Sequence, residues 1–287
     1  MPHPDYRIQA HVCVACRGPE EAPTIGHGPR GKFHSKSQTT LRYAVDDVRA
    51  WAAYFQGGEH DEEDVVNHYV VLESATAGAL QDAIAEAIDR LDFHFEDSAG
   101  GSLNFVFSGH GATNGDLVLA DRLVSPDELM EWCAGGRAGD NGKTRHLRTA
   151  IDSCYSGLTL CRLVMHPHHG RRVVVRDGFA ACLPSEEAFE LRSLRHSVLT
   201  YTMLRPGTRL LLKRPLTAEE FKEVKASIRE TTEYLTNGKQ HSLDIINGYA
   251  ISQRGSANRS VEVLDTETLD ELVEAVNSLP RRRPRAG

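Results

Sequence analysis

The sequence has no long apolar run, no excess of positive charge and few cysteines, and each of these absences excludes a class of protein. No apolar run approaches the roughly 18 residues of a membrane span, so we expect no membrane partner. The formal net charge of −7 gives no reason to expect nucleic acid as a partner, although it is compatible with cationic substrates. The first residues, MPHPDYRIQAHVCVAC, lack the layout of a signal peptide, so we expect a cytoplasmic protein.

Six cysteines in 287 residues are too few for a disulfide scaffold, and in a reducing compartment we expect free thiols. Cys13 and Cys16 have the spacing of a zinc or redox pair. A zinc site needs a second pair of ligands, however, and a redox motif usually opens a helix. Both cysteines lie in IQAHVCVAC, which has the composition of a strand. We predict core positions for them, and a metal-binding or redox module stays as an alternative.

Strand and helix signals alternate along the chain, which indicates βαβ units and an α/β fold with a mostly parallel sheet. We predict a single domain over residues 1–287, with its core at about 7–252 and a disordered basic tail at 280–287. Predicted strands lie at residues 7–15, 67–72, 104–107, 148–152, 172–183 and 244–251. Predicted helices lie at residues 41–55, 76–91, 195–204 and 217–235, with another beginning near Ser125. A hairpin is expected at 116–124.

Two short segments carry the chemistry. Residues 104–111 read NFVFSGHG and residues 149–157 read TAIDSCYSG, and each is an apolar run that ends at small residues beside a reactive side chain. Buried parallel strands that end in this way place the next side chain at the carboxyl edge of a sheet, where catalytic groups collect. His110 and Cys154 are therefore the candidate base and nucleophile.

A cysteine attacks as its thiolate, so a catalytic cysteine needs a neighbouring base. His110 can take the thiol proton and later protonate the leaving amine. Gly109 and Gly111 allow a sharp turn beside the histidine, and their unhindered N–H groups can face a developing oxyanion. The pattern favours acyl transfer by a cysteine nucleophile.

The segments Ser108–Gly111 and Asp152–Gly157 resemble the two signature segments of the caspase/metacaspase family of cysteine peptidases. His110 precedes Cys154 by a separation similar to the roughly 50 residues of the caspase pattern. The resemblance covers about residues 7–252 and implies a caspase-like three-layer α/β/α sandwich with a mostly parallel six-stranded sheet. It also implies attack by Cys154, acid–base catalysis by His110, and oxyanion stabilisation by the N–H groups of Gly111 and Cys154. No third triad residue is evident.

Charge beside the nucleophile predicts the substrate. Asp152 precedes Cys154 by two residues, as in metacaspases, so both side chains are expected on one face of the strand. A carboxylate there attracts a cationic side chain and repels an acidic one. By the resemblance, Asp47 is the second acidic residue of this S1 pocket, although its neighbour Asp46 competes for that role. We therefore expect protein or peptide substrates cleaved after Arg or Lys.

The sequence carries only weak signals for regulation and for cofactors. The stretch 158–177 follows the nucleophile, where family members are often cut, and it is a candidate processing site for the enzyme itself or for an upstream activating protease. It carries four arginines: Arg162, Arg171, Arg172 and Arg176. No metal or other cofactor is expected, and calcium dependence stays open because Asp116, Asp121 and Asp140 lack an EF-hand-like spacing. The histidines at 166, 168 and 169 are expected in a solvated loop.

The prediction is a cysteine endopeptidase of caspase/metacaspase type, with a role in a bacterial stress, cell-death or antiphage cascade. The alternative is a catalytically silent caspase-like scaffold that binds a partner. The presence of both His110 and Cys154 argues against that alternative.

Overall fold

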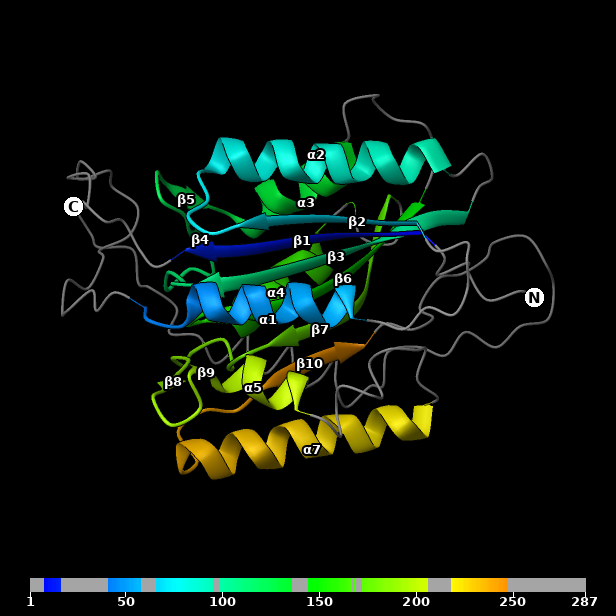
Figure 1. The fold of residues 1–287 in the computed structure, drawn as a ribbon. Coiled ribbons are helices and arrows are strands. Elements are labelled where there is room, and N and C mark those ends of the chain that lie inside the picture. Colours follow the sequence, from blue (N-terminus) through cyan, green and yellow to red (C-terminus); the bar gives the residue numbers. More distant parts are fainter. Residues whose placement is uncertain are drawn as a thin grey trace, which may run out of the picture.

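A six-stranded sheet forms the centre of the computed structural model, which describes residues 8–16, 41–57, 66–94, 99–135, 144–166, 168, 172–205 and 218–246 (Figure 1). The strands follow the order β10-β7-β6-β3-β1-β2. Their bounds are β1 (Ile8–Cys16), β2 (Val66–Leu72), β3 (Ala99–Gly109), β6 (Thr144–Asp152), β7 (Val173–Ala180) and β10 (Leu243–Ile246). All neighbouring strands are parallel except β10, which is antiparallel to β7. The predicted mostly parallel six-stranded sheet is confirmed.

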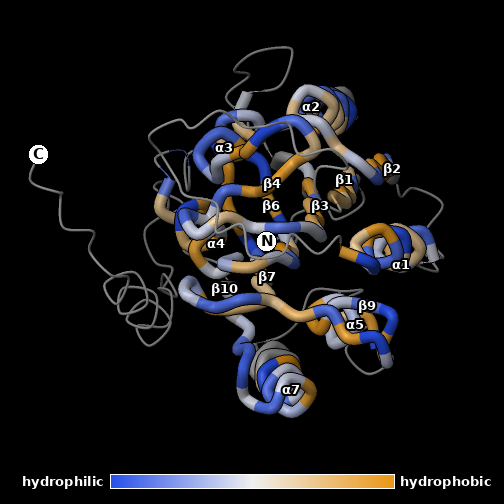
Figure 2. The backbone as a smooth tube through the Cα atoms, turned by 90° about the vertical axis from the view of Figure 1, so that its left-hand side faces the viewer, coloured by the Kyte–Doolittle hydropathy of each residue, from blue (hydrophilic) through white to orange (hydrophobic). Residues whose placement is uncertain are grey.

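Helices cover both faces of the sheet, which makes the architecture three-layered (Figure 2). Their bounds are α1 (Ala44–Gln56), α2 (Ala77–His94), α3 (Pro126–Gly135), α4 (Ser156–Met165), α5 (Val198–Leu204) and α7 (Ala218–Thr236). One apolar cluster joins the sheet to α2, α3 and α4, and the other joins it to α1, α5 and α7. The alternation of side chains along each strand supplies residues to both clusters.

The register of β3 and β6 brings the two predicted catalytic segments together. Ser108 pairs with Asp152 at the carboxyl ends of these adjacent central strands. Both strands are nearly completely buried there, as expected for parallel strands covered on both faces. The residues that follow each strand therefore emerge side by side at one edge of the sheet.

Strand alternation also decides between the interpretations of Cys13 and Cys16. Cys13 packs in the cluster with α1, whereas Cys16 packs in the cluster with α2, so the two side chains lie on opposite faces of β1. Both are buried. A shared metal ion or a redox disulfide would need both sulfurs on one side, so the core-strand prediction is confirmed and the alternative module is not supported.

Two elements differ from the predicted pattern. The sequence predicts no helix or strand for residues 158–171, but α4 extends to Met165, whereas the strand predicted at 172–183 is present as β7, which begins at Val173. Seven of the ten residues of α4 are buried, and no side chain caps its start, so the usual N-terminal signal of a helix is absent from the sequence. The predicted helix at 195–204 begins only at Val198, because His196 and Ser197 form β9 and pair with β8 (Glu190–Leu191).

Three further predictions concern the hairpin, the single domain and membrane spans. The hairpin expected at 116–124 is present as β4 (Leu117–Val118) and β5 (Leu123–Val124). The single domain stays a prediction, and its tail at 280–287 lies outside the described residues. Within the described parts of the chain, none of the helices has the length and hydropathy that a membrane crossing requires.

Candidate active site

The nucleophile candidate sits in a sharp turn between a central strand and a helix. β6 ends at Asp152, and α4 begins at Ser156 after Tyr155, whose φ of 58° is left-handed. Gly157 donates its N–H to the Cys182 carbonyl at 2.9 Å, and a methyl group added there would lie 2.6 Å from that oxygen. Of the six cysteines, Cys154 alone is partly exposed, and the other five are buried. Exposure therefore singles out the cysteine that the sequence predicts as nucleophile.

The turn that carries His110 touches the turn that carries Cys154. A methyl group added to Gly111 would overlap the carbonyl oxygen of Cys154 and would lie 2.9 Å from the Ser153 hydroxyl oxygen. Only a glycine allows this approach of the two backbones. His110 itself is partly exposed. The structure thus places the imidazole and the thiol on adjoining turns at one sheet edge.

Among the residues that the structure describes, the N–H of Gly111 has no hydrogen-bond acceptor, as an oxyanion donor requires. Gly111 and Leu117 form an isolated antiparallel bridge. The two hydrogen bonds of this bridge run from the Ala112 N–H to the Asp116 carbonyl at 2.9 Å and from the Val118 N–H to the His110 carbonyl at 3.0 Å. The bridge fixes the turn beside His110 without using the Gly111 N–H.

The environment of Cys154 favours the neutral thiol. Burial raises the pKa of the Cys154 thiol, and the carboxylates of Glu187 and Asp152 raise it further. Sγ lies 4.0 Å from the carbonyl oxygen of Ala188. Because the free thiol is not a nucleophile, any attack from this site requires transfer of its proton to a base, and His110 lies on the adjoining turn.

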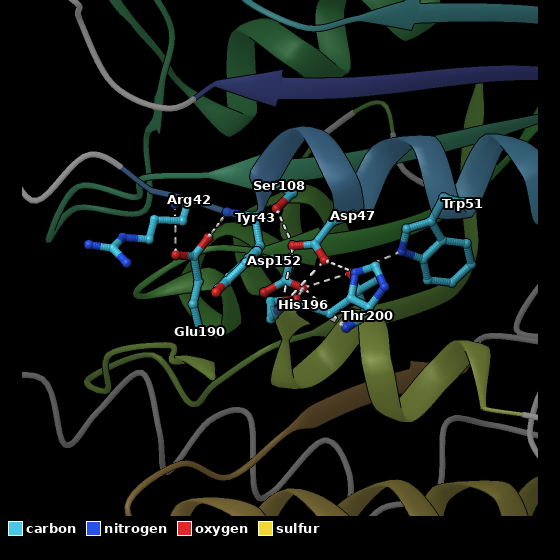
Figure 3. Close-up of polar contacts among 10 residues, drawn as sticks. Arg42, Tyr43, Asp47, Trp51, Ser108, Asp152, Glu190, His196 and Thr200 are labelled. Carbon is cyan, nitrogen blue, oxygen red and sulfur yellow. Dashed lines mark hydrogen bonds and ion pairs between the residues drawn. The ribbon is translucent and has the colours of Figure 1, made fainter. Parts of the chain in front are cut away.

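Asp47 and Asp152 form a buried pair of carboxylates behind the nucleophile (Figure 3). Asp47 in α1 is 0% exposed and Asp152 is 5% exposed, whereas Asp46 is exposed, so Asp47 is the one that points inward. Ser197 joins the pair, because its N–H donates to Asp47 and its hydroxyl donates to Asp152. The sequence-predicted acidic residues are therefore brought together, but both are covered rather than open.

Each carboxylate of this pair has further donors. Asp152 Oδ2 accepts from the N–H and the hydroxyl of Thr200 at 3.2 and 2.9 Å, so Asp152 helps to cap α5. Asp47 accepts from the Ser108 hydroxyl at 3.0 Å. Burial, and then the negative charge of Asp47, raise the pKa of Asp152, while the hydrogen bonds from Ser197 and Thr200 act in the opposite direction.

His196 is a residue of this site that the sequence did not indicate. Its Nδ1 lies 2.8 Å from Asp47 Oδ1, although the two residues are 149 positions apart (Figure 3). The side chain is 28% exposed, while that of Asp47 is 0% exposed, so His196 lies between the carboxylates and solvent. The hydrogen bond to Asp47 raises the pKa of His196, against the effect of its own burial. No sequence spacing could have linked these two residues.

Gln240, which the sequence also did not indicate, holds the loop beside Cys154. Gln240 is fully buried after α7, donates to the Ala181 carbonyl at 2.8 Å and accepts from the Phe189 N–H at 3.0 Å. It thereby clamps both ends of the segment 181–189. Within that segment the Glu186 carbonyl accepts from the Tyr155 N–H at 2.9 Å, and the Glu186 carboxylate pairs with His241 at 2.7 Å. The C-terminal elements therefore hold the nucleophile turn in place.

Candidate metal ligands are occupied by other partners. Asp116 pairs with Arg162 at 3.0 Å, Asp121 accepts from the Ala77 N–H at 2.8 Å, and Asp140 lies outside the described residues. Among the residues that the structure describes, no three His, Cys, Asp or Glu side chains form a metal-binding group.

The three histidines after α4 differ from the expected solvated loop. The side chain of His166 is only 8% exposed, and His168 Nε2 lies 3.0 Å from a carboxylate oxygen of Glu131. His169 is outside the described residues. The structure thus supplies an acidic partner that the sequence did not indicate.

The arginines of the predicted processing stretch are mostly held in the fold. Arg162 lies in α4 and also pairs with Asp127 at 2.6 Å, and Arg176 is buried in β7. Arg172 lies in the turn before β7, and Arg171 is outside the described residues. The helix α4, which the sequence did not predict, and the predicted strand β7 occupy most of the stretch 158–177, and processing within it stays a prediction.

Comparison with solved structures identifies the fold. The crystal structure of caspase-1 from Spodoptera frugiperda superposes with a TM-score of 0.54 and 13% sequence identity, covering 84% of this chain and 86% of that chain. The structure of pro-sf-caspase-1 gives a TM-score of 0.51 and 12% identity, covering 84% and 92% of the two chains. Neither a protein-family model nor a curated protein matches the sequence. The predicted caspase-like α/β/α sandwich is thus confirmed as a fold.

Proposed function

We propose that this chain is a cysteine endopeptidase with a Cys154–His110 dyad that cleaves proteins after Arg or Lys. The observation that supports the proposal is the contact of the two turns at Gly111, by which the turn that carries the partly exposed Cys154 adjoins the turn that carries His110 at the carboxyl edge of the sheet. A caspase-like fold agrees with peptidase chemistry, but fold alone does not assign it.

The mechanism follows from the groups at this edge. His110 takes the thiol proton as Cys154 Sγ attacks the peptide carbonyl, and the N–H groups of Gly111 and Cys154 stabilise the tetrahedral oxyanion. Collapse of the intermediate breaks the C–N bond, and His110 gives its proton to the leaving amine. Water, deprotonated by His110, then hydrolyses the thioester and regenerates the thiol. The raised pKa of Cys154 makes the base essential rather than auxiliary.

The preference for a basic P1 side chain rests on the carboxylate pair. Asp152 ends β6, directly before the turn of Cys154, and Asp47 lies in the first turn of α1; the charge of Asp152 is one of the causes that raise the pKa of Cys154. In the described residues, every hydrogen bond accepted by Asp152 ends on Oδ2. Oδ1 is therefore the oxygen that we assign to a guanidinium or ammonium group. An acidic P1 side chain would meet like charge here.

A fluorogenic peptide panel with Arg, Lys, Asp and Leu at P1, run with and without calcium, tests this function. Wild-type protein is expected to cleave the Arg and Lys peptides, and Cys154→Ala and His110→Ala are each expected to lower kcat roughly 10²- to 10⁴-fold. Cys161→Ala, at a buried thiol in α4, is the matched control and should retain activity. Asp152→Asn should lower kcat/KM for Arg peptides far more than for Leu peptides.

The outcomes separate the alternatives. Preferential cleavage after Asp or Leu would overturn the role given to Asp152 and Asp47. Absence of cleavage, together with absence of labelling of Cys154 by a thiol-reactive peptide probe, would favour the silent scaffold. A role in a bacterial stress, cell-death or antiphage cascade, with processing before β7, is part of the proposal. New N-termini that also form in purified Cys154→Ala would rule out self-processing and point to an upstream protease.

A further inference from the structure

His196 occupies the entrance to the buried carboxylate pair. Its Nδ1 is 2.8 Å from Asp47 Oδ1, and the ring keeps 28% exposure while Asp47 has none (Figure 3). The next residue, Ser197, binds both carboxylates through its N–H and its hydroxyl. The backbone of β9 therefore fixes the imidazole against Asp47, one residue away from the group that bridges Asp47 and Asp152.

The charges that face His196 are mainly negative. From α1 come Asp47 in contact and Asp46 nearby, and from β6 comes Asp152. Burial and the negative charge of Asp47 both raise the pKa of Glu190 on β8. The Glu190 carboxylate accepts hydrogen bonds from the backbone N–H groups of Arg42 and Tyr43. Arg42 interacts electrostatically with Glu190 rather than with the pair. On its own segment, Arg192 and Arg195 are exposed. A cation at His196 is thus favoured by the carboxylates of α1 and β6, while α5, which also packs against β9, carries no charged residue.

We propose that His196 is a specificity-determining residue, which as an imidazolium acts as the resident counterion of Asp47 and Asp152 and competes with a basic P1 side chain. As a neutral imidazole it no longer neutralises Asp47, so the negative charge of the pair is available to the substrate. This inference rests on the proposed function, because it concerns the same pocket and the same substrate class.

The competition has a definite proton balance. When His196 is protonated, entry of a P1 guanidinium or ammonium places two cations on one carboxylate pair, and the N–H proton of the imidazolium leaves to solvent as the substrate binds. Binding is then coupled to release of one proton, so the affinity for a basic P1 residue falls roughly tenfold for each pH unit below the pKa of His196. The hydrogen bond to Asp47 raises the pKa of His196, so this competition extends to higher pH than it would for an ordinary histidine.

Two substitutions that fix the charge at this position, one neutral and one positive, test the proposal. His196→Gln is neutral at all pH values and keeps a hydrogen-bond donor for Asp47, while His196→Lys is a permanent cation. KM for Arg peptides is measured at about pH 6, below the ordinary histidine pKa of about 6.5, and at about pH 8.5, well above it. We expect His196→Gln to lower KM roughly tenfold at the lower pH and His196→Lys to raise it roughly tenfold at the higher pH, with kcat little changed.

The matched control is His68→Gln, because His68 is a histidine of similar exposure, 23%, that faces the carboxylate of Glu86 away from this site. It should shift KM at neither pH. A purely structural role for His196 would make both substitutions raise KM or lower kcat at both pH values, and that result would overturn the inference. If wild-type protein cleaves Leu or Asp peptides but no basic ones, the proposed specificity and this inference both fail. If it cleaves basic peptides and the two variants behave alike, only this inference fails.

Discussion

The turns that carry His110 and Cys154 and the carboxylate pair lie at the same ends of β3 and β6, but they are held by different kinds of interaction. The turns are fixed by backbone contact, because Gly111 approaches the Cys154 carbonyl too closely for any side chain. The carboxylate pair is fixed by side chains and N–H groups of the distant β9 and α5, such as Ser197 and Thr200. Substitutions in the first region should therefore act through shape, and those in the second through charge.

This difference also separates stability from activity. A backbone turn with no room for a side chain can only be damaged by an added group. A buried pair of like charges costs free energy in the folded state, so removing one charge can stabilise the protein while it weakens the substrate pocket. The two regions thus give opposite expectations for the free energy of unfolding.

The largest effect is expected from Gly111→Ala. The new methyl group overlaps the Cys154 carbonyl, so the two turns must move apart. We expect kcat/KM to fall by roughly 10²-fold or more, since displacements of about 1 Å near a nucleophile have that effect. The free energy of unfolding should fall by about 1–3 kcal/mol. Peptide cleavage and urea unfolding are the measurements.

Gly78→Ala is the matched control for this substitution. Gly78 lies in α2 and has no other atom within 4 Å of the added methyl group, so alanine should stabilise that helix by about 0.5–1 kcal/mol with no change in kcat/KM. Full activity in Gly111→Ala would mean that the contact between the turns does not position the dyad.

A smaller effect is expected at Gln240, which links the turns to the C-terminal half of the fold. Gln240→Ala leaves the Ala181 carbonyl and the Phe189 N–H without a buried partner, and the segment 181–189 loosens. We expect the protein to lose about 1–3 kcal/mol of stability and kcat/KM to fall roughly tenfold. Thermal unfolding and peptide cleavage measure the two changes.

Gln56→Ala, at an exposed position of the same residue type in α1, should change the free energy of unfolding by less than about 0.5 kcal/mol. Loss of stability in Gln240→Ala without any loss of activity would show that the segment 181–189 does not support the nucleophile turn.

Local patterns in the sequence predict the fold and the proximity of the turns that carry His110 and Cys154. The apolar runs before His110 and Cys154 predict strand ends, and parallel strand ends share one edge, so their proximity follows from the fold class. The position of Asp152 at the same edge follows from the same rule, because Asp152 ends β6. These inferences need only neighbours in the sequence and the rules of parallel sheets.

The remaining residues of the site depend on contacts that leave no local signal. His196 meets Asp47 across 149 positions, and Gln240 meets Phe189 across 51. Burial of the carboxylate pair was also missed, because covering it requires α5 to begin at Val198, after β9, rather than at the predicted residue 195. Helix α4 was missed because it is buried on most sides and lacks a side-chain cap. Tertiary packing decides each of these features.

The smallest effect is expected at the carboxylate pair, where removing a charge should raise the free energy of unfolding rather than lower it. The pKa values of Asp152 and His196 are both raised in the folded state, the first by burial and the second chiefly by its hydrogen bond to Asp47. The folded state therefore binds more protons than the unfolded state. Stability should fall as the pH rises from about 4, the ordinary value for Asp, through about 6.5, the ordinary value for His, and beyond the folded pKa of His196.

Asp152→Asn removes the first of these titrations and keeps an amide oxygen to accept from Ser197 and Thr200. At neutral pH the variant should be more stable than wild-type protein by about 1–2 kcal/mol, and this gain should shrink towards pH 4, where Asp152 is protonated in wild type. Urea unfolding of both proteins across this pH range measures it. A variant that is less stable than wild type at every pH would mean that the pair stabilises the fold, and the contrast with the turns that carry His110 and Cys154 would disappear.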